Sequence, residues 1–346
     1  MNDIHRTPAH FPASELMPLR GVPERYRSTH QDMDVLEVFR LMARARALEE
    51  RLVKISKTEH GYFWIGGPGE EGFNIPLGLL VRCGQGLDYD FLHFHYRSSG
   101  VMVAMGMEPI DAIRQMCSRA TDPFSGGRNF VAHFAYSKWN VIPGTSTIET
   151  QYAVAPGTAL AQLRHGGQGI TIVTGGDAGS AEGDFATCLN WASRPGNELP
   201  LLVVVANNQF GISTPYDEVR AADSVIPRCA SFGIRWEIVD GNDPFESWRV
   251  LSEAMAYVRE ERKPFGIEAR VSRLHGHSSS SGGARVTTEV DCLEVLQNKL
   301  IADGTLTEDD AATIRAGYAR ECLEAFHRVI EEPIPDASTI SDHIFA

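Results

Sequence analysis

The sequence predicts an α/β fold, a doubly wound and mainly parallel sheet with helices on both faces. Four apolar segments rich in valine and isoleucine, residues 170–175, 201–206, 235–241 and 265–272, have the length of buried strands. Segments long enough for helices separate them, and strands that alternate with helices form a parallel sheet. A chain of 346 residues can hold one large α/β domain with extensions, or two small domains.

Helical patterns flank and connect these strands. The first covers residues 33–56, where apolar residues recur at helical spacing. The last lies between residues 288 and 332, where Thr307 with Asp310 is a plausible helix N-cap. The other helices are predicted at about residues 71–82, 108–118, 182–193 and 244–261.

The remaining segments are predicted to be irregular. Residues 91–97 are a short aromatic and basic segment, and residues 121–150 are loop-like and polar. A loop of that length is usually functional or disordered, and its aromatic residues favour order. We therefore expect three parts: an extended N-terminal arm at 1–32, an α/β domain at 33–287, and a helical segment with an extended tail at 288–346.

The charge and the cysteines exclude several classes of protein. The net charge of −13 disfavours binding to nucleic acid or to an anionic membrane, so a phosphate-bearing ligand must be held by local groups. No pair among the six cysteines forms a CxxC motif, which argues against a zinc site and a disulfide framework. The sequence shows no apolar run long enough for a transmembrane helix and no targeting segment at its start. These features predict a cytoplasmic protein.

Polar side chains follow two successive predicted strands. Asp177 comes after the first, and Asn207 and Asn208 come after the second. Ligands of parallel sheets bind at the carboxyl ends of the strands, and Mg²⁺ prefers oxygen ligands. Ser180 and nearby helix amides could add donors to a phosphate. Taken singly, Asp177 could cap a helix and the asparagines could form a turn, but together they favour a metal–diphosphate site.

A glycine-rich loop at residues 67–72 matches the dinucleotide-binding pattern GxGxxG. No strand-like segment precedes it, and Glu70 and Glu71 would repel a pyrophosphate. A nicotinamide-binding enzyme is therefore disfavoured.

Gly176-Asp177, followed 30 positions later by Asn207, resembles the thiamine diphosphate signature. The same order of motifs, over about residues 35–335, is similar to the α subunits of the decarboxylating first component of 2-oxo acid dehydrogenase complexes, nearest to the branched-chain type. The other matching motifs are Gly69–Gly72, Tyr96-Arg97, Gly127-Arg128 with His133, Asn208 with Gly211–Pro215, and His275–Ser278.

The resemblance implies a fold of the thiamine diphosphate-binding type and a set of metal ligands. These would be Asp177, Asn208 and the backbone carbonyl of Phe210, which would hold Mg²⁺. Tyr96 and Arg97 would contact the diphosphate, although without this context they could lie in a surface loop.

Five further residues are implied around the cofactor. Ala178 and Gly179 would offer backbone amides to the phosphates, and Ser146 and Ile148 would line the cofactor. The Ser146–Gln151 segment also binds a monovalent cation such as K⁺ in some members of the family. His277 would be catalytic beside the reacting carbon, although a histidine in a loop is more often solvated or structural.

The implied function is the oxidative decarboxylation of a 2-oxo acid and transfer of the acyl group to the lipoyl group of a dihydrolipoyl acyltransferase. A separate β subunit would complete the pocket in a heterotetramer of two α and two β chains, and the α chain alone would be inactive. A branched-chain substrate such as 3-methyl-2-oxobutanoate is favoured, with pyruvate or acetoin enzymes as alternatives. A catalytically silent α-like scaffold is the alternative from another class.

Three departures from the family pattern bear on these expectations. Ala178 replaces the second glycine of Gly-Asp-Gly, which is harmful if the position needs a positive φ and harmless if it is helical. The interval from Asp177 to Asn208 is about two residues longer than usual, at residues 194–197. Residues 278–283 carry no acid, which puts regulatory phosphorylation in doubt.

Overall fold

The computed structural model describes residues 19–27, 32–219 and 222–342, and in these the predicted α/β sheet is confirmed. Five parallel strands pair in the order β1-β2-β3-β7-β6. The strands are β1 (Phe91–His93), β2 (Thr171–Gly176), β3 (Leu201–Asn207), β6 (Arg235–Asp240) and β7 (Phe265–Arg270). Because Gly176 pairs with Ala206, the carboxyl ends of β2 and β3 lie side by side.

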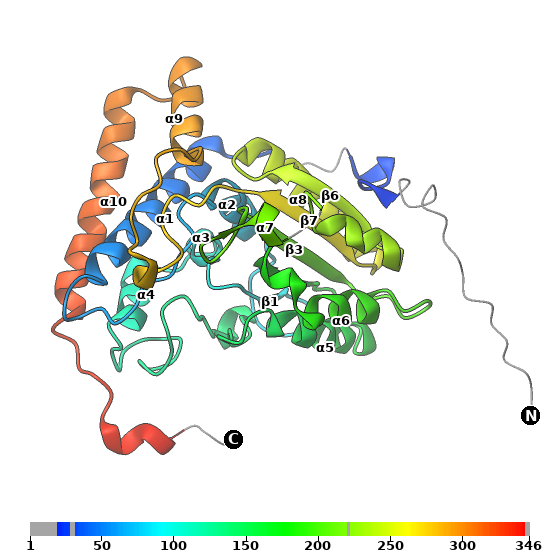
Figure 1. Cartoon of the computed structure of the whole chain (residues 1–346), viewed down its shortest axis with the longest axis horizontal. Helices are drawn as coiled ribbons and strands as arrows, with labels where there is room; N and C mark the ends of the chain where they lie inside the picture. Colours follow the sequence, from blue (N-terminus) through cyan, green and yellow to red (C-terminus); the bar gives the residue numbers. More distant parts are fainter. Residues whose placement is uncertain (1–18, 28–31, 220–221, 343–346) are drawn as a thin grey trace, which may run out of the picture.

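Alternate side chains of the central strand β3 enter two hydrophobic cores, as a doubly wound sheet requires. Leu202 and Val204 belong to the core shared with α1 (Val35–Ile55), α2 (Glu71–Leu80) and α8 (Pro244–Glu261). Val203 and Val205 belong to the core shared with α5 (Thr150–Arg164) and α6 (Gly183–Ala192). Helices α8 and α6 accordingly lie on opposite faces of the sheet (Figure 1).

The C-terminal helices pack against the first helix. Helices α9 (Cys292–Ala302) and α10 (Glu308–Val329) contribute buried residues to the same core as α1, and α10 runs alongside α1 (Figure 1). The predicted N-cap is present, because the Thr307 hydroxyl accepts from the Asp310 amide at 3.1 Å. The other short elements are α3 (Ser99–Ala104), α4 (Pro109–Met116), α7 (Tyr216–Val219), β4 (Phe210–Gly211) and β5 (Thr214–Pro215).

Several elements differ from the sequence prediction. Helix α5 was not predicted, because Pro156 lies inside it and its apolar residues show no strong helical period. Strand β1 has only three residues, too few for a periodic signal. Strand β7 ends at Arg270, so the predicted strand was two residues too long. The tail includes a 3-10 turn at Ala337–Ser341, where an extended conformation was expected.

The predicted N-terminal arm falls mostly outside the described residues, as do residues 343–346 of the tail. Within the arm, the Gly21 amide donates to the carbonyl of Trp236 at 2.8 Å, so this part packs on the edge strand β6. Each cysteine is a free thiol, as expected. In the part of the chain that the structure describes, no helix combines the length and apolar character needed to cross a bilayer.

Candidate active site

A pocket of ≈ 790 Å³ opens at the carboxyl ends of β2 and β3. The structure places in its lining every metal-binding, cofactor-binding and catalytic residue that the resemblance implied, from Tyr96 to His277, 181 positions apart in the chain. Their individual roles stay predictions. The predicted residues in the lining are Tyr96, Arg97, Ser146, Ile148, Asp177, Ala178, Gly179, Asn208, Phe210 and His277.

The predicted metal ligands follow directly from the two central strands. Asp177 is buried, and its amide continues the ladder by donating to the carbonyl of Ala206 at 3.2 Å. The Asn208 side-chain oxygen accepts from the Phe210 amide at 3.2 Å, which fixes the turn after β3. Among the described residues, no three His, Cys, Asp or Glu side chains gather into a metal-binding group. One carboxylate with amide and carbonyl oxygens is a donor set that Mg²⁺ accepts when phosphate and water complete its shell.

The neighbouring asparagine has a different role from Asn208. The Asn207 amide donates to the Glu268 carboxylate at 2.8 Å, and its oxygen accepts from the Gln209 amide at 3.1 Å. Glu268 in turn accepts from the amides of Val225 and Ile226 at 2.7 and 2.9 Å. Asn207 therefore ties the carboxyl end of β3 to β7 through Glu268, while Asn208 lines the pocket.

The Ala178 position is compatible with alanine. Its φ of −64° and ψ of −43° are helical, so the loss of the family's glycine causes no backbone strain. Gly211 makes room for the methyl group, because a Cβ at Gly211 would lie 2.9 Å from that of Ala178. The Ser180 hydroxyl donates to the Asp177 carbonyl at 2.6 Å, and Ser180 is not in the pocket lining. The phosphate donor expected from Ser180 is therefore not seen.

Arg97 and His277 are held together on one wall of the pocket. The Arg97 guanidinium lies over the Tyr96 ring, 5.2 Å from its centre, and donates to the carbonyl of Gly66. It also lies 3.1 Å from His277 Nδ1. Because arginine can only donate, Nδ1 must accept, and the neutral imidazole carries its proton on Nε2. Burial, together with the charges of Arg97 and Arg273, lowers the pKa of His277 to about 4, so it is neutral at pH 7.

Ser146 is oriented by a histidine that the resemblance had singled out. The Ser146 hydroxyl lies 3.0 Å from His133 Nε2, and His133 Nδ1 lies 3.0 Å from the carbonyl of Val131. Since the carbonyl accepts, Nδ1 carries the proton and the serine donates to Nε2. The ring of His133 also stacks on Tyr96 at 6.4 Å, which joins the loop at residues 121–150 to the pocket wall.

Glu149 lines the pocket; it lies in the predicted Ser146–Gln151 segment, but the sequence did not single it out as a site residue. Its backbone is left-handed, with a φ of 64°, and its carboxyl group packs against Gly175 and Gly179, where any Cβ would overlap it. One oxygen accepts from the Gly176 amide at 3.1 Å; the other has no hydrogen-bond partner among the described residues. Burial raises the pKa of Glu149 to about 8. The sequence contains Gly175 and Gly179, but it does not reveal that they pack against the Glu149 carboxyl group.

His95 is the second missed residue. Its side chain lines the pocket, it is buried, and its Nδ1 has no hydrogen-bond partner in the described chain. Burial lowers the pKa of His95 well below its usual value, so the ring is neutral. Its place in the aromatic and basic segment, directly before Tyr96, was the available signal.

The rim of the pocket is apolar and exposed. Four apolar side chains there, Tyr62, Phe130, Ile148 and Ile212, are 42–74% exposed. Ile212 also has a φ of 57°, an uncommon conformation for a β-branched residue. Apolar side chains gathered around a pocket mouth are typical of an interaction surface.

The glycine-rich loop at residues 67–72 is not a dinucleotide site. The segment before it makes only an isolated bridge, between Ile65 and Ser278, within the described residues. Glu71 turns inward, accepts from the Gly69 amide at 2.7 Å, and pairs with Arg46. The loop therefore anchors α2 in the interior.

Comparisons with known proteins agree with this geometry. A family model described as "Dehydrogenase E1 component" matches residues 39–338. The chain is 31% identical over 323 residues to the 2-oxoisovalerate dehydrogenase subunit alpha of Bacillus subtilis (strain 168), covering 91% of this chain and 96% of that protein. It is 26% identical over 320 residues to the mitochondrial 2-oxoisovalerate dehydrogenase subunit alpha of Homo sapiens, covering 90% and 70%. These matches confirm the resemblance, and the chain belongs to the dehydrogenase E1 component family.

Proposed function

We propose that this chain is the α subunit of a branched-chain 2-oxo acid dehydrogenase. The enzyme would decarboxylate a 2-oxo acid such as 3-methyl-2-oxobutanoate and pass the acyl group to the lipoyl group of a dihydrolipoyl acyltransferase. The supporting observation is the convergence of Asp177, Asn208, Arg97 and His277 on one pocket at the carboxyl ends of parallel strands. The names of the relatives from Bacillus subtilis and Homo sapiens support the branched-chain substrate.

Thiamine diphosphate with Mg²⁺ fits the chemistry of the pocket. When bound, the cofactor supplies the electron sink for decarboxylation. Asp177, Asn208 and the Phe210 carbonyl would hold the metal, and Tyr96, Arg97 and the amides of Ala178 and Gly179 would hold the diphosphate. Arg97 is the single arginine or lysine in the described lining, so a divalent metal is needed to balance the phosphate charge beside the pocket's carboxylates.

His277 is the residue we assign to catalysis. It is neutral at pH 7 and carries its proton on Nε2, so it can donate a hydrogen bond to an atom that becomes negative during acyl transfer. Arg97 fixes this tautomer because its guanidinium occupies Nδ1. The arrangement gives His277 a defined orientation before any substrate binds.

A monovalent cation such as K⁺ is proposed beside the segment from Ser146 to Gln151. The observation that supports it is the buried Glu149 oxygen without a partner among the described residues. A cation there would replace the proton of the Glu149 carboxyl group and brace the strand end next to Asp177, where the Gly176 amide donates to Glu149. We expect the cofactor-free complex to unfold at a higher temperature in K⁺ than in choline, and equal temperatures would contradict the cation site.

A β subunit is the proposed partner, in a heterotetramer of two α and two β chains. The exposed apolar rim formed by Tyr62, Phe130, Ile148 and Ile212 suits a surface that another chain covers. Because the rim surrounds the pocket, that chain would also complete the site. The lipoyl-bearing acyltransferase would then reach the pocket from the open side of the assembly.

The test is to co-express the chain with its β subunit and assay 3-methyl-2-oxobutanoate, pyruvate and acetoin with thiamine diphosphate and Mg²⁺. We expect decarboxylation of the branched-chain acid to have the highest kcat/KM, and the α chain alone to be inactive. A preference for pyruvate or acetoin would overturn the substrate assignment. Failure of the complex to bind the cofactor would overturn the enzyme assignment and favour a silent scaffold.

A further inference from the structure

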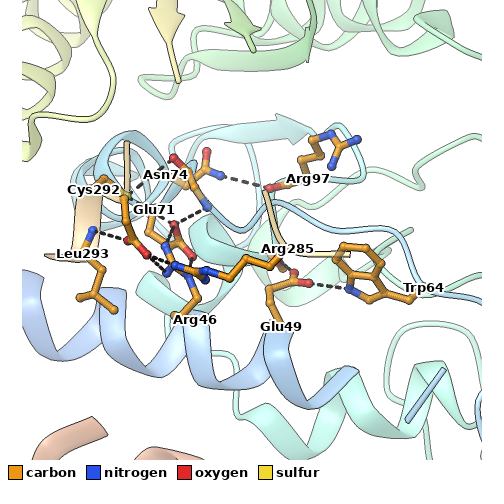
Figure 2. A network of polar contacts seen from close by, with 12 residues as sticks. Arg46, Glu49, Trp64, Glu71, Asn74, Arg97, Arg285, Cys292 and Leu293 are labelled. Carbon is orange, nitrogen blue, oxygen red and sulfur yellow. Dashed lines mark hydrogen bonds and ion pairs between the residues drawn. The ribbon is translucent and has the colours of Figure 1, made fainter. Parts of the chain in front are cut away.

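Glu49 is a buried glutamate on α1 that does not line the pocket. One of its oxygens accepts from the Trp64 indole nitrogen at 2.9 Å, as Figure 2 shows. The other accepts from the Ser99 hydroxyl. A single carboxyl group thus joins the loop at Trp64 to the first residue of α3, 35 positions later in the chain.

The Trp64 loop contacts the Arg97 side chain, and the segment that ends at Ser99 contains Arg97. Trp64 lies two residues before Gly66, and the Gly66 carbonyl accepts from the Arg97 guanidinium. Ser99 lies two residues after Arg97 in the chain. A Cβ at Gly66 would overlap the Glu49 carboxyl group, so the Gly66 peptide packs directly against it.

Another contact fixes the backbone of the same arginine. The Asn74 side-chain amide donates to the Arg97 carbonyl at 3.1 Å, and the two residues face each other in Figure 2. The backbone of Arg97 is therefore held from α2. Its guanidinium depends on the Gly66 carbonyl, whose position depends on Glu49.

We propose that Glu49 is a positioning residue that sets the guanidinium of Arg97 for the diphosphate of the cofactor. The proposal rests on the role of Arg97 given under the proposed function. Glu49 itself touches neither cofactor nor substrate. It acts by connecting the Trp64–Gly66 segment to the Arg97–Ser99 segment.

The two hydrogen bonds of Glu49 provide a sharp test. Glutamine can still accept from the Trp64 indole through its side-chain oxygen, and its amide can donate to the Ser99 hydroxyl, because a hydroxyl group can accept as well as donate. Alanine can make neither contact. Glu49→Gln should therefore rescue what Glu49→Ala loses.

The experiment compares wild type, Glu49→Ala and Glu49→Gln, each co-purified with the β chain. Glu253→Ala is the matched control, because Glu253 is also a buried glutamate, lies on α8, and pairs with Arg249 at 3.2 Å. We measure the Kd for thiamine diphosphate at saturating Mg²⁺, kcat at saturating cofactor, and the thermal midpoint. A purely structural role would lower the midpoint without a selective effect on Kd.

For Glu49→Ala we expect a Kd about tenfold higher, equivalent to one misplaced charged hydrogen bond, with kcat at saturating cofactor within about threefold of wild type. Glu49→Gln and Glu253→Ala should bind the cofactor like wild type. Wild-type affinity in Glu49→Ala, or an equal loss in Glu49→Gln, would overturn the proposal while leaving the proposed function intact. No cofactor binding by wild type would overturn the proposed function itself.

If Glu49→Ala does not fold, Ser99→Ala and Trp64→Phe replace it, since each removes one hydrogen bond to Glu49. Each should weaken cofactor binding by a few-fold, about the value of one neutral hydrogen bond. Unchanged Kd values in both variants would overturn the proposal.

Discussion

Two groups of buried polar residues in this protein differ in how many of their polar atoms have a hydrogen-bond partner. Away from the pocket lining, Arg46 pairs with Glu71 at 2.7 Å and with Asp291 at 2.8 Å, and its neighbours in Figure 2 complete an internal network. At the pocket, Glu149 and His95 each keep a buried polar atom without a hydrogen-bond partner among the described residues. The residue types are similar, and the two groups differ in whether each buried polar atom has a hydrogen-bond partner.

The difference has an energetic meaning. A buried polar atom without a partner costs about 1–3 kcal/mol, so a folded protein retains it where a ligand supplies the missing contact. A fully paired buried ion cluster has no capacity left for a ligand, and removing one member leaves uncompensated charge. Substitutions in the pocket should therefore change binding, whereas substitutions in the Arg46 cluster should change stability.

The largest expected effect is on binding. Asp177→Ala should abolish Mg²⁺-dependent binding of thiamine diphosphate and, with it, decarboxylation, because the only carboxylate ligand proposed for the metal is lost. Calorimetric titration of the complex measures this directly. Retained affinity would remove Asp177 from the ligand set and weaken the distinction between the two groups of buried residues.

His277→Ala should separate binding from chemistry. Cofactor binding should remain close to wild type, while acyl transfer to the lipoyl group slows by about 10²–10⁴-fold, the usual contribution of a general acid or base. Single-turnover kinetics with a lipoyl acceptor measures this step. If the variant transfers the acyl group at the wild-type rate, His277 has a structural role only.

Arg46→Met should affect stability. Removing this arginine leaves Glu71 buried without its ion-pair partner and leaves Asp291 with Arg285 alone, at a cost of about 3–5 kcal/mol in the free energy of unfolding. Arg40→Met on the same helix is the matched control, because both side chains of its ion pair with Glu37 are about half exposed and the pair should contribute about 1 kcal/mol or less. Urea denaturation compares the two, and equal losses would show that the Arg46 cluster is not a special support.

The smallest expected effect is a change of the thermal midpoint with pH. The pKa of Glu149 is raised to about 8 from 4.5, so the folded state holds a proton that the unfolded state releases. The contribution of protonated Glu149 to the stability of the folded state is fully present below about pH 4.5 and is lost as the pH rises through about 8. The thermal midpoint of the cofactor-free complex should fall from about pH 6.5 to about pH 8.5, a range above the titration of His277.

Glu149→Gln should flatten this pH dependence, because glutamine has nearly the shape of the neutral acid but no group that titrates in this range. Part of the slope should persist, since burial also raises the pKa of Glu70 to about 8. An unchanged slope in Glu149→Gln would assign the whole effect to Glu70 or another group.

The local features of the fold could be predicted from the sequence. The Val-rich runs of β2 and β3 indicated buried parallel strands, and Asp177 and Asn208 directly after them indicated the pocket edge. The family motifs then brought Arg97 and His277 to the same place. These predictions succeeded because short segments encode them.

Features that depend on contacts between distant segments could not be predicted. Glu149 fits only because Gly175 and Gly179 leave space for it, and the Glu49 carboxyl group joins the Trp64 loop to the start of α3, far away in the sequence. The conformation of Ala178 was equally undetermined until its φ was known. The residues at the pocket edge could thus be predicted from short segments of sequence. The contacts that support them join distant segments and could not be predicted.

The most direct test of the central claim is a titration of thiamine diphosphate into the complex of this chain with its β subunit, in Mg²⁺ and again in EDTA. We expect tight binding that requires the metal, because Arg97 alone cannot balance a diphosphate beside Asp177. Binding of equal strength in EDTA, or none in Mg²⁺, would contradict it.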